Sequence, residues 1–282
     1  MAFQFWEQAK KNIKSRIEPH VYERIDMLSR KNINEFGVDP FGFDPEMLKL
    51  VAPLAVWLYR NYFRCEVEGL ENIPDGRMIV ISNHSGQLPF DGMMIETAFL
   101  LEAKTPRILR GMAERWSADL PFVSKFFARG GTVVGDPNAC RQLLKMEEAV
   151  LVFPEGVKAI VKLFSQRYQL FEFGRGFMRL ALQTRSPILP ITVIGAEEQA
   201  PAIANLVPLA KMLHIPALPI IFPQIIPIPL PVKYRIIIGE PLYFKGDGTE
   251  DDEVITSYVA QTKACMQSMI DKGRYKRKNI FF

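Results

Sequence analysis

Short apolar runs rich in β-branched residues alternate with helical patterns from about residue 66 onward, and this alternation constrains the fold more than any other feature. The clearest pair is the run 78–83, MIVISN, followed by the helical pattern of residues 90–103. Strands that alternate with helices in this way are typical of an α/β sheet. We therefore expect a central, mostly parallel or mixed sheet flanked by helices, with six or seven strands that include residues 78–83, 106–112, 131–135, 149–153, 187–195 and 234–239.

Two helices are expected ahead of this sheet. The first, over residues 1–33, carries an apolar and aromatic stripe bordered by lysine and arginine, and the second, over residues 46–63, ends in aromatic residues. Pro53 is expected to kink the second helix or to mark its start. Such faces suit a membrane interface, while packing on their own domain is the alternative for both helices. We take residues 1–65 as an N-terminal helical membrane-interaction segment.

The α/β domain is expected to span residues 66–248 and to contain an apolar, proline-rich loop at residues 206–232. The prolines argue against a regular helix or a central strand there. A large apolar loop marks a contact with lipid, an acyl chain or a partner, unless the core buries it. The segment 249–282 is expected to be a helix that ends at Lys272 and Gly273, followed by a basic tail that is either a lipid contact or a solvated terminus.

The composition narrows the class of protein. With 48% hydrophobic residues and a net charge of +4, the chain is globular and mildly basic, which suits an anionic membrane surface. No nucleic-acid-binding motif accompanies the basic tail, so nucleic acid is not expected as a partner. The cysteines form no metal-ligand cluster with histidine, so no metal is expected. The sequence shows no signal peptide and no run of about 20 apolar residues, which favours peripheral or shallow contact with the cytoplasmic face of a membrane and leaves the oligomeric state open.

Polar residues gather around the ends of the expected strands. His84 follows the run 78–83, Glu155 follows the run 149–153, and Arg129 lies in the turn before another strand. Because ligands bind at the carboxyl ends of strands in open α/β sheets, these residues are expected to converge on one site.

A neutral imidazole at such a site can take a proton from a hydroxyl that attacks a carbonyl. Asp91 could hold the other ring nitrogen of His84 and so fix the tautomer. A histidine and an aspartate at this spacing also fit a purely structural hydrogen bond. No serine lies in a G-x-S-x-G elbow, so the sequence does not favour a serine hydrolase.

Four motifs follow one another in the order NHSGQLPFDG (83–92), FFARGG (126–131), VFPEG (152–156) and PILPITVIGAEE (187–198). As an ordered set they resemble the glycerolipid acyltransferase family, which includes lysophosphatidate acyltransferases, and the resemblance covers about residues 66–200. DPFGFDP (39–45) and the stretch 153–182 further resemble a branch of that family near mono- and diacylglycerol acyltransferases.

The resemblance implies that His84 is the base that activates an acceptor hydroxyl against an acyl thioester, with Asp91 as its partner. It also implies that residues of the second and third motifs bind the acceptor. A guanidinium suits phosphate there, and glycine lets backbone approach closely. The residues assigned to acceptor binding are Arg129, Gly130, Glu155 and Gly156, with Lys158 at a position where the family usually has arginine.

Two features depart from the family pattern. Six residues separate His84 from Asp91 where four are usual, so Pro89 must help to fold the chain back. Lys158 is a point charge and not a bidentate clamp, which leaves the choice between a phosphorylated and a neutral acceptor open. Arg175, flanked by glycines, is either a further anion contact or a solvated turn residue.

Together these observations predict a membrane-associated O-acyltransferase that acts on membrane lipid. Its co-substrate is acyl-CoA or an acyl carrier protein thioester, and no further cofactor is expected. The acceptor is the hydroxyl of lysophosphatidate or a related lysophospholipid. The alternatives are a neutral mono- or diacylglycerol acceptor, a non-catalytic lipid-binding scaffold, and a lipid hydrolase.

Overall fold

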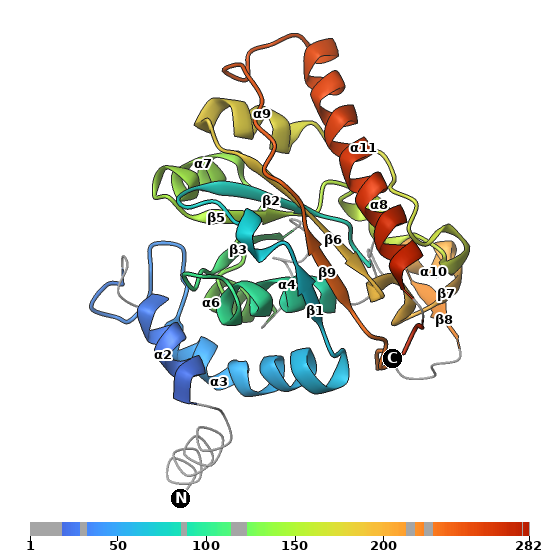
Figure 1. Ribbon diagram of the computed structural model, residues 1–282, viewed down its shortest axis with the longest axis horizontal. Helices are drawn as coiled ribbons and strands as arrows, with labels where there is room; N and C mark the ends of the chain where they lie inside the picture. The colour runs from blue at the N-terminus through green and yellow to red at the C-terminus, as the bar shows by residue number, and fades with distance from the viewer. Residues whose placement is uncertain are drawn as a thin grey trace, which may run out of the picture.

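The computed structural model describes residues 19–28, 33–85, 89–113, 123–212, 218–222, 228–277 and 279–281. A seven-stranded sheet forms the centre of this part of the chain (Figure 1). Its strands are β1 (Glu66–Glu68), β2 (Met78–Ser82), β3 (Leu109–Ala113), β4 (Val133–Val134), β5 (Ala149–Val152), β6 (Ile188–Ile194) and β9 (Arg235–Ile238).

The strands lie in the order β1-β9-β6-β2-β5-β3-β4. The five strands from β6 to β4 are parallel, whereas β9 pairs antiparallel with β6 and parallel with β1. All five residues of β2 are buried, as expected for a central strand whose faces are both covered by helices. This arrangement confirms the expected α/β fold with a mostly parallel sheet.

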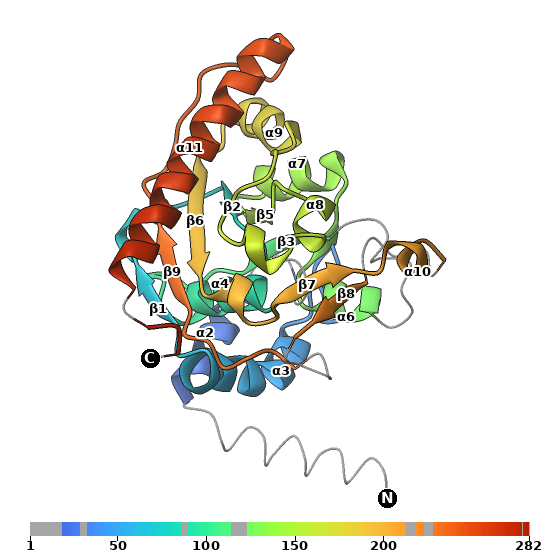
Figure 2. The same ribbon diagram turned by 90° about the vertical axis from the view of Figure 1, so that its right-hand side faces the viewer.

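Helices cover both faces of the sheet (Figures 1 and 2). One face carries α4 (Phe90–Leu101), behind which lie α2 (Pro19–Leu28) and α3 (Pro45–Trp57). The other face carries α7 (Pro137–Lys145), α9 (Gly176–Thr184) and the long α11 (Asp252–Lys276). The shorter helices α6 (Val123–Arg129), α8 (Val157–Ile160) and α10 (Val207–Met212) lie in connections between strands.

The N-terminal helices differ in part from the expectation. Of the helix expected over residues 1–33, residues 19–28 are helical as α2, and residues 1–18 and 29–32 lie outside the described residues. Pro53 lies inside α3 and does not mark its start. The helix begins at Pro45, because Asp44 caps it by accepting the backbone N–H groups of Glu46 and Met47 at 3.0 and 3.1 Å.

The DPFGFDP stretch builds a clamp around a buried arginine, which we call the Arg110 clamp. Asp39 Oδ1 accepts the backbone N–H groups of Phe41 and Phe43, both at 2.8 Å, and Asp39 Oδ2 accepts Arg110 Nη2 at 2.7 Å. Both phenyl rings lie within 6 Å of the guanidinium, at a distance that suits cation–π attraction. The clamp therefore ties the N-terminal segment to β3.

The proline-rich loop contains more regular structure than its sequence suggests. Strands β7 (Ala202–Asn205) and β8 (Pro219–Ile221) form a two-stranded sheet, and α10 lies between them. The expectation that proline excludes a helix here is wrong for α10, because Pro208 is its second residue and the first turn of a helix tolerates proline. Residues 213–217 and 223–227 lie outside the described residues.

The C-terminal helix is longer than expected. It continues to Lys276 and does not end at Lys272 and Gly273. Gly273 serves close packing instead, since a Cβ atom there would lie 2.6 Å from Ile237 Cδ1. The tail that follows is anchored and not simply solvated, because the Arg277 guanidinium donates to the carbonyl of Ile280 at 2.7 Å and to the Tyr168 hydroxyl at 3.2 Å.

No helix among the described residues is both long and apolar enough to cross a bilayer. The boundaries expected at residues 65/66 and 248/249 stay a prediction. In space, β1 of the second segment pairs with β9, and α11 of the third packs on β6 and β9, so the three segments share one folded body.

Candidate active site

His84 lies just beyond the carboxyl end of β2, where Asp91 orients its ring. The ring nitrogen Nδ1 is 2.8 Å from Asp91 Oδ2. Asp91 is in the first turn of α4, where the helix dipole favours a negative charge, and it also accepts the backbone N–H groups of Ser85 and Gly92 at 2.6 and 2.8 Å. The six-residue spacing therefore brings the two expected partners together, with Pro89 at the start of the helix.

The protonation of this pair follows from its surroundings. Burial acts to lower the pKa of His84, but attraction to Asp91, with a smaller contribution from Glu155, outweighs burial and the opposing Lys162, so this pKa is raised. Burial acts to raise the pKa of Asp91, but His84 and two backbone amides hold it below its usual range. Asp91 thus stays ionised and fixes the proton of neutral His84 on Nδ1.

The other ring nitrogen of His84, Nε2, takes no part in the hydrogen bond to Asp91. No hydrogen bond reaches it from the described part of the chain, and the side chain is 15% exposed. Phe153 stacks on the ring, with centroids 4.1 Å apart and an angle of 25° between the planes. The stacking and the Asp91 hydrogen bond together hold the imidazole in one orientation.

Asn83 fixes the backbone just before His84. Its side-chain oxygen accepts the backbone N–H of Val193 at 2.8 Å, and its nitrogen donates to the carbonyl of the same residue at 3.1 Å. The same nitrogen also lies 3.3 Å from Glu197 Oε1. Asn83 therefore continues the pairing of β2 with β6 through its side chain and positions His84 at the edge of the sheet.

Glu155 follows β5 and is buried beside His84. Its Oε2 accepts the backbone N–H of Phe171 at 2.8 Å and lies 3.1 Å from Lys162 Nζ. Its Oε1 is buried without a hydrogen-bond partner among the described residues, an arrangement that costs free energy unless a donor arrives. One oxygen of Glu155 is thus structural, and the other can accept a hydrogen bond from a ligand.

The turn between β5 and α8 depends on Gly156. Its φ of 56° and ψ of −143° form a backbone conformation that is costly for other residues, so glycine is required where the chain turns sharply after Glu155.

The structure does not bring Lys158 and Arg175 to His84. Lys158 Nζ pairs with Glu172 at 2.7 Å on the surface. Arg175 Nη1 pairs with Asp252 at 2.6 Å, which ties α9 to the start of α11. Both cations are thus engaged in surface ion pairs, and their contact with the acceptor stays a prediction.

Arg129 and Gly130 also lie apart from the pair formed by His84 and Asp91. They precede β4, whereas His84 follows β2, and β5 and β3 lie between these strands. The Arg129 carbonyl accepts the backbone N–H of Asp44, so this turn contacts the start of α3. Arg129 and Gly130 come before their strand, so the rule that ligands bind at the carboxyl ends of strands does not place them beside His84.

Sequence reasoning missed four side chains that shape the site, namely Asn83, Phe153, Lys162 and Glu197. Only Lys162 carries a signal in the sequence, since it is a charged residue within an otherwise apolar stretch. Within the described residues, no three side chains of His, Cys, Asp or Glu lie together as a metal site would require.

Comparison with known proteins identifies the class of protein. The Acyltransferase family profile matches residues 64–194, which include β2, β5 and β6 and both members of the His84 and Asp91 pair. An uncharacterised protein of Mycobacterium tuberculosis is 37% identical over 266 residues, which cover 90% of this chain and 74% of that protein. The chain belongs to the acyltransferase family and is an acyltransferase.

Two further comparisons place it within this family. A chicken protein named as a DGAT1/2-independent enzyme synthesizing storage lipids is 27% identical, over 76% of this chain and 61% of that protein. The crystal structure of the 1-acyl-sn-glycerophosphate acyltransferase PlsC from Thermotoga maritima superposes with a TM-score of 0.52 and 20% identity, over 83% of this chain and 80% of that one. The chain is thus related to acyltransferases of lipid metabolism, and it shares the fold of PlsC.

Proposed function

We propose that this acyltransferase moves a fatty acyl group from acyl-CoA or an acyl carrier protein onto a glycerolipid hydroxyl, with His84 as general base. The observation that carries the proposal is the His84 ring, held by Asp91 at Nδ1, with a side chain that is 15% exposed. Phosphorylated lysolipid is the first acceptor to test, because PlsC is named as an acyltransferase of 1-acyl-sn-glycerophosphate.

The proposed reaction balances without a protein nucleophile. Nε2 of His84 removes the proton of the acceptor hydroxyl as the oxygen attacks the thioester carbonyl. The tetrahedral intermediate then collapses, the carbon–sulfur bond breaks, and the thiolate takes the proton back from the imidazolium. The products are an ester and a thiol, and Asp91 stabilises the imidazolium between the two steps.

A neutral acceptor is a second candidate, and the positions of two cations favour it. Lys158 and Arg175, the residues expected to hold a phosphate, are engaged by Glu172 and Asp252. The chicken relative is named for the synthesis of storage lipids. Mono- or diacylglycerol therefore enters the test beside lysophosphatidate.

The direct test combines purified protein with acyl-CoA or acyl carrier protein donors and with phosphorylated or neutral acceptors in vesicles. Thiol release and the lipid product, followed by mass spectrometry, separate transfer from hydrolysis, because only transfer forms a new ester. His84→Ala should lower the rate of transfer by roughly 10²–10⁴, while His20→Ala, at an exposed histidine of α2, serves as the matched control. Transfer by a correctly folded His84→Ala variant at the rate of the wild-type protein would rule out the proposed base.

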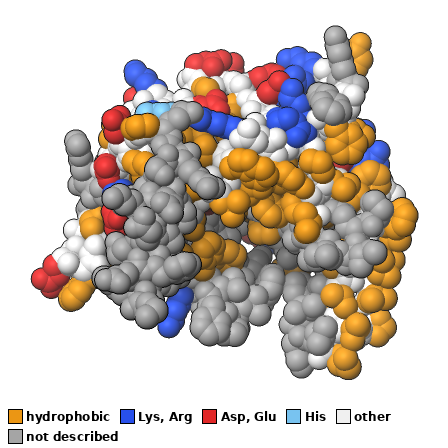
Figure 3. All heavy atoms as spheres, turned by 90° about the horizontal axis from the view of Figure 1, so that it is seen from below, with side chains coloured by type: hydrophobic (Ala, Val, Ile, Leu, Met, Phe, Trp, Pro, Cys, Tyr) orange, Lys and Arg blue, Asp and Glu red, His pale blue; other side chains and the backbone are white. Residues whose placement is uncertain are grey.

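We also propose that the protein works at the cytoplasmic face of a membrane. Apolar side chains are gathered on the face seen in Figure 3. Exposed apolar residues occur on α3, on α6 and on the β7, α10 and β8 segment, and they include Leu54, Trp57, Phe126, Ile203, Leu206, Val207, Met212, Ile220 and Phe222.

Charge supports the same proposal. The sequence from Gln199 to Gly239 contains no aspartate or glutamate, and neither does the sequence from residue 47 to 65 or from 120 to 135. Segments that combine exposed apolar side chains with only positive charges suit an anionic bilayer.

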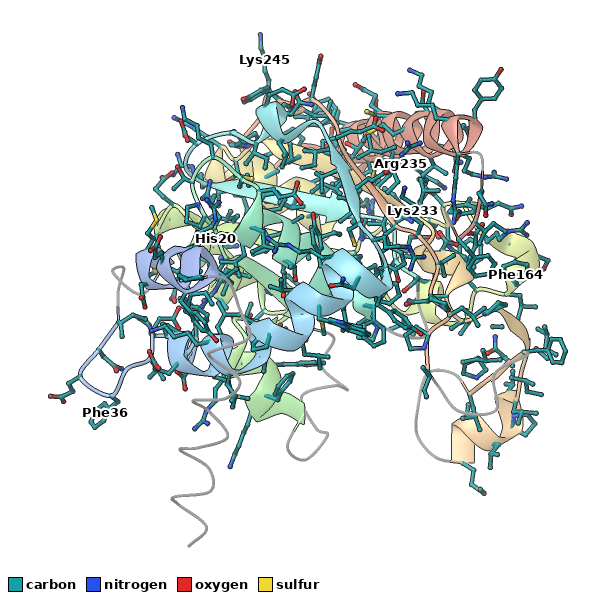
Figure 4. All side chains as sticks on the ribbon, turned by 60° about the horizontal axis from the view of Figure 1, so that its bottom comes forward. His20, Phe36, Phe164, Lys233, Arg235 and Lys245 are labelled. Atoms are coloured by element: carbon teal, nitrogen blue, oxygen red, sulfur yellow. The ribbon has the colours of Figure 1, made fainter. Side chains whose placement is uncertain are left out.

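The membrane proposal is tested by sedimentation with phosphatidylglycerol vesicles. Met212→Ser combined with Phe222→Ser should weaken binding several-fold. Tyr243→Ser is the control, because Tyr243 is exposed but near Lys245, which lies at the edge of the molecule far from α10 (Figure 4). Equal vesicle binding by both variants would contradict the proposed surface.

A further inference from the structure

Lys162 is a buried cation that lies between two carboxylates. Its Nζ is 3.1 Å from Glu155 Oε2 and 3.4 Å from Glu197 Oε2, and its side chain is 3% exposed. The ring of Phe171 lies 5.2 Å from the ammonium group. A lysine is rarely buried to this extent unless the structure uses its charge.

The two carboxylates are linked to His84 through different neighbours. Glu197 accepts the side-chain N–H of Asn83, the residue directly before His84, and also the backbone N–H of Tyr168 at 2.9 Å. Glu155 belongs to the turn that begins with Phe153, whose ring stacks on the imidazole. Lys162 therefore connects the backbone before His84 with the ring stacked on it.

The charges also require Lys162. Burial raises the pKa of Glu197, and the first influence that opposes this shift is Lys162, while Glu155 adds to it. Glu155 and Glu197 are both buried, so their negative charges repel each other, and the Lys162 ammonium between them offsets that repulsion.

We propose that Lys162 is a positioning residue of the active site, whose ammonium group bridges Glu155 and Glu197 and holds the turn after β5 against the end of β2. The inference rests on the proposed function, because it concerns the residues around the same base. Among the described residues, the charged groups that face His84 or this bridge are Asp91 from α4, Glu155 from the turn after β5, and Glu197 from the turn after β6.

The proposal predicts opposite shifts in two variants. Lys162→Met removes a positive charge that lowers the pKa of His84, so the acidic limb of the kcat/KM profile moves to higher pH. Glu197→Gln removes one negative charge and should move the same limb to lower pH. The double variant restores the net charge and should return the limb close to that of the wild-type protein.

A purely structural lysine would behave differently. Loss of packing would lower kcat/KM by the same factor at every pH, whereas the proposal requires that the Lys162→Met protein lose most activity near pH 6 and recover toward pH 9. Lys272→Met, an exposed lysine of α11, is the matched control and should leave the profile unchanged. A uniform loss with an unmoved acidic limb, or equal shifts in Lys162→Met and Lys272→Met, would overturn the proposal.

A second measurement separates this inference from the proposed function. A buried carboxylate whose folded pKa is raised favours the folded state at low pH, and this advantage is lost as pH rises from the unfolded pKa through the folded one. Relative to wild type, the unfolding midpoint of Lys162→Met should therefore fall as pH rises above the ordinary carboxyl range, while that of Glu197→Gln should rise. If the wild-type protein transfers no acyl group, the proposed function fails. The unfolding midpoints then decide by themselves whether Lys162 bridges the two carboxylates. Differences between the variants and the wild-type protein that do not depend on pH would reject the bridge.

Discussion

The active-site cluster and the Arg110 clamp both bury a cation against carboxylate, yet they differ in what they leave open. At the active site, Lys162 lies between Glu155 and Glu197, and the neighbouring His84 side chain keeps 15% of its surface exposed. In the clamp, Arg110 is 1% exposed and meets Asp39 between two phenyl rings. A buried charge beside a partly exposed imidazole can take part in a reaction, whereas a closed charge pair serves to stabilise the fold.

The sharpest test of this difference is His84→Ala. It should lower kcat/KM for acyl transfer by roughly 10²–10⁴, the usual contribution of a general base. It should lower the unfolding midpoint less than the clamp variant does, because Asp91 keeps the backbone N–H groups of Ser85 and Gly92 as partners. Acyl transfer by mass spectrometry and thermal unfolding by circular dichroism measure the two effects. If the variant lost stability and activity to the same degree, the active-site cluster would act on the fold in the same way as the Arg110 clamp, and the proposed difference between them would be wrong.

Asp39→Asn should have the reverse effect. It leaves the buried guanidinium of Arg110 without its carboxylate, and loss of one member of a buried ion pair costs about 3–5 kcal/mol of unfolding free energy. Activity per folded molecule should stay within about twofold of wild type, because the clamp contacts none of the residues around His84. Urea denaturation gives the free energy, and a large drop in kcat at full folding would show that the clamp also acts on the site.

The pH dependence of the reaction tests the active-site cluster alone. Because Asp91 raises the pKa of His84, the imidazole becomes neutral only above its ordinary value of 6.5, and kcat/KM should fall about tenfold for each pH unit below the raised pKa. The measurement is a kcat/KM profile from pH 5 to 9. An acidic limb centred below pH 6 would contradict the raised pKa.

The smallest expected effect lies beside the clamp, at Glu96 of α4. Burial raises the pKa of Glu96 to about 8, an effect that Arg110 opposes. The raised folded pKa favours the folded state at low pH, and this advantage is lost as pH rises from about 4.5 to 8. Glu96→Gln should therefore raise the unfolding midpoint by a few degrees at pH 8 relative to wild type and by less at pH 5, with kcat/KM unchanged. An equal change at both pH values would show that Glu96 does not titrate in this range.

The sequence predicts the sheet well because its strands are continuous apolar runs. The run 78–83 became the fully buried β2, whereas β1, β7 and β8 are short and at sheet edges, so their patterns are too weak to detect. The helix end at Lys272 was placed too early because Gly273 is a common stop signal, and here it serves the contact with Ile237.

The site was predictable in part. His84 and Asp91 share one segment, so local sequence was enough to pair them. The ion pairs of Lys158 and Arg175 could not be predicted, because their acidic partners, Glu172 and Asp252, are 14 and 77 positions further on, and no local pattern reveals such pairs. Lys162 and Glu197 were missed because only the folded chain shows that their charges are buried together.

The pairing of β1 with β9 sets the order in which the sheet can be finished. Glu66 aligns with Arg235, so the first strand must wait for a partner that is synthesised about 170 residues later. Contacts between such distant parts of a chain form slowly, since a long loop must close before they stabilise anything. During translation the parallel strands from β2 to β6 can assemble first. The outer edge of β6 then has no partner strand until β9 has been synthesised and pairs with it.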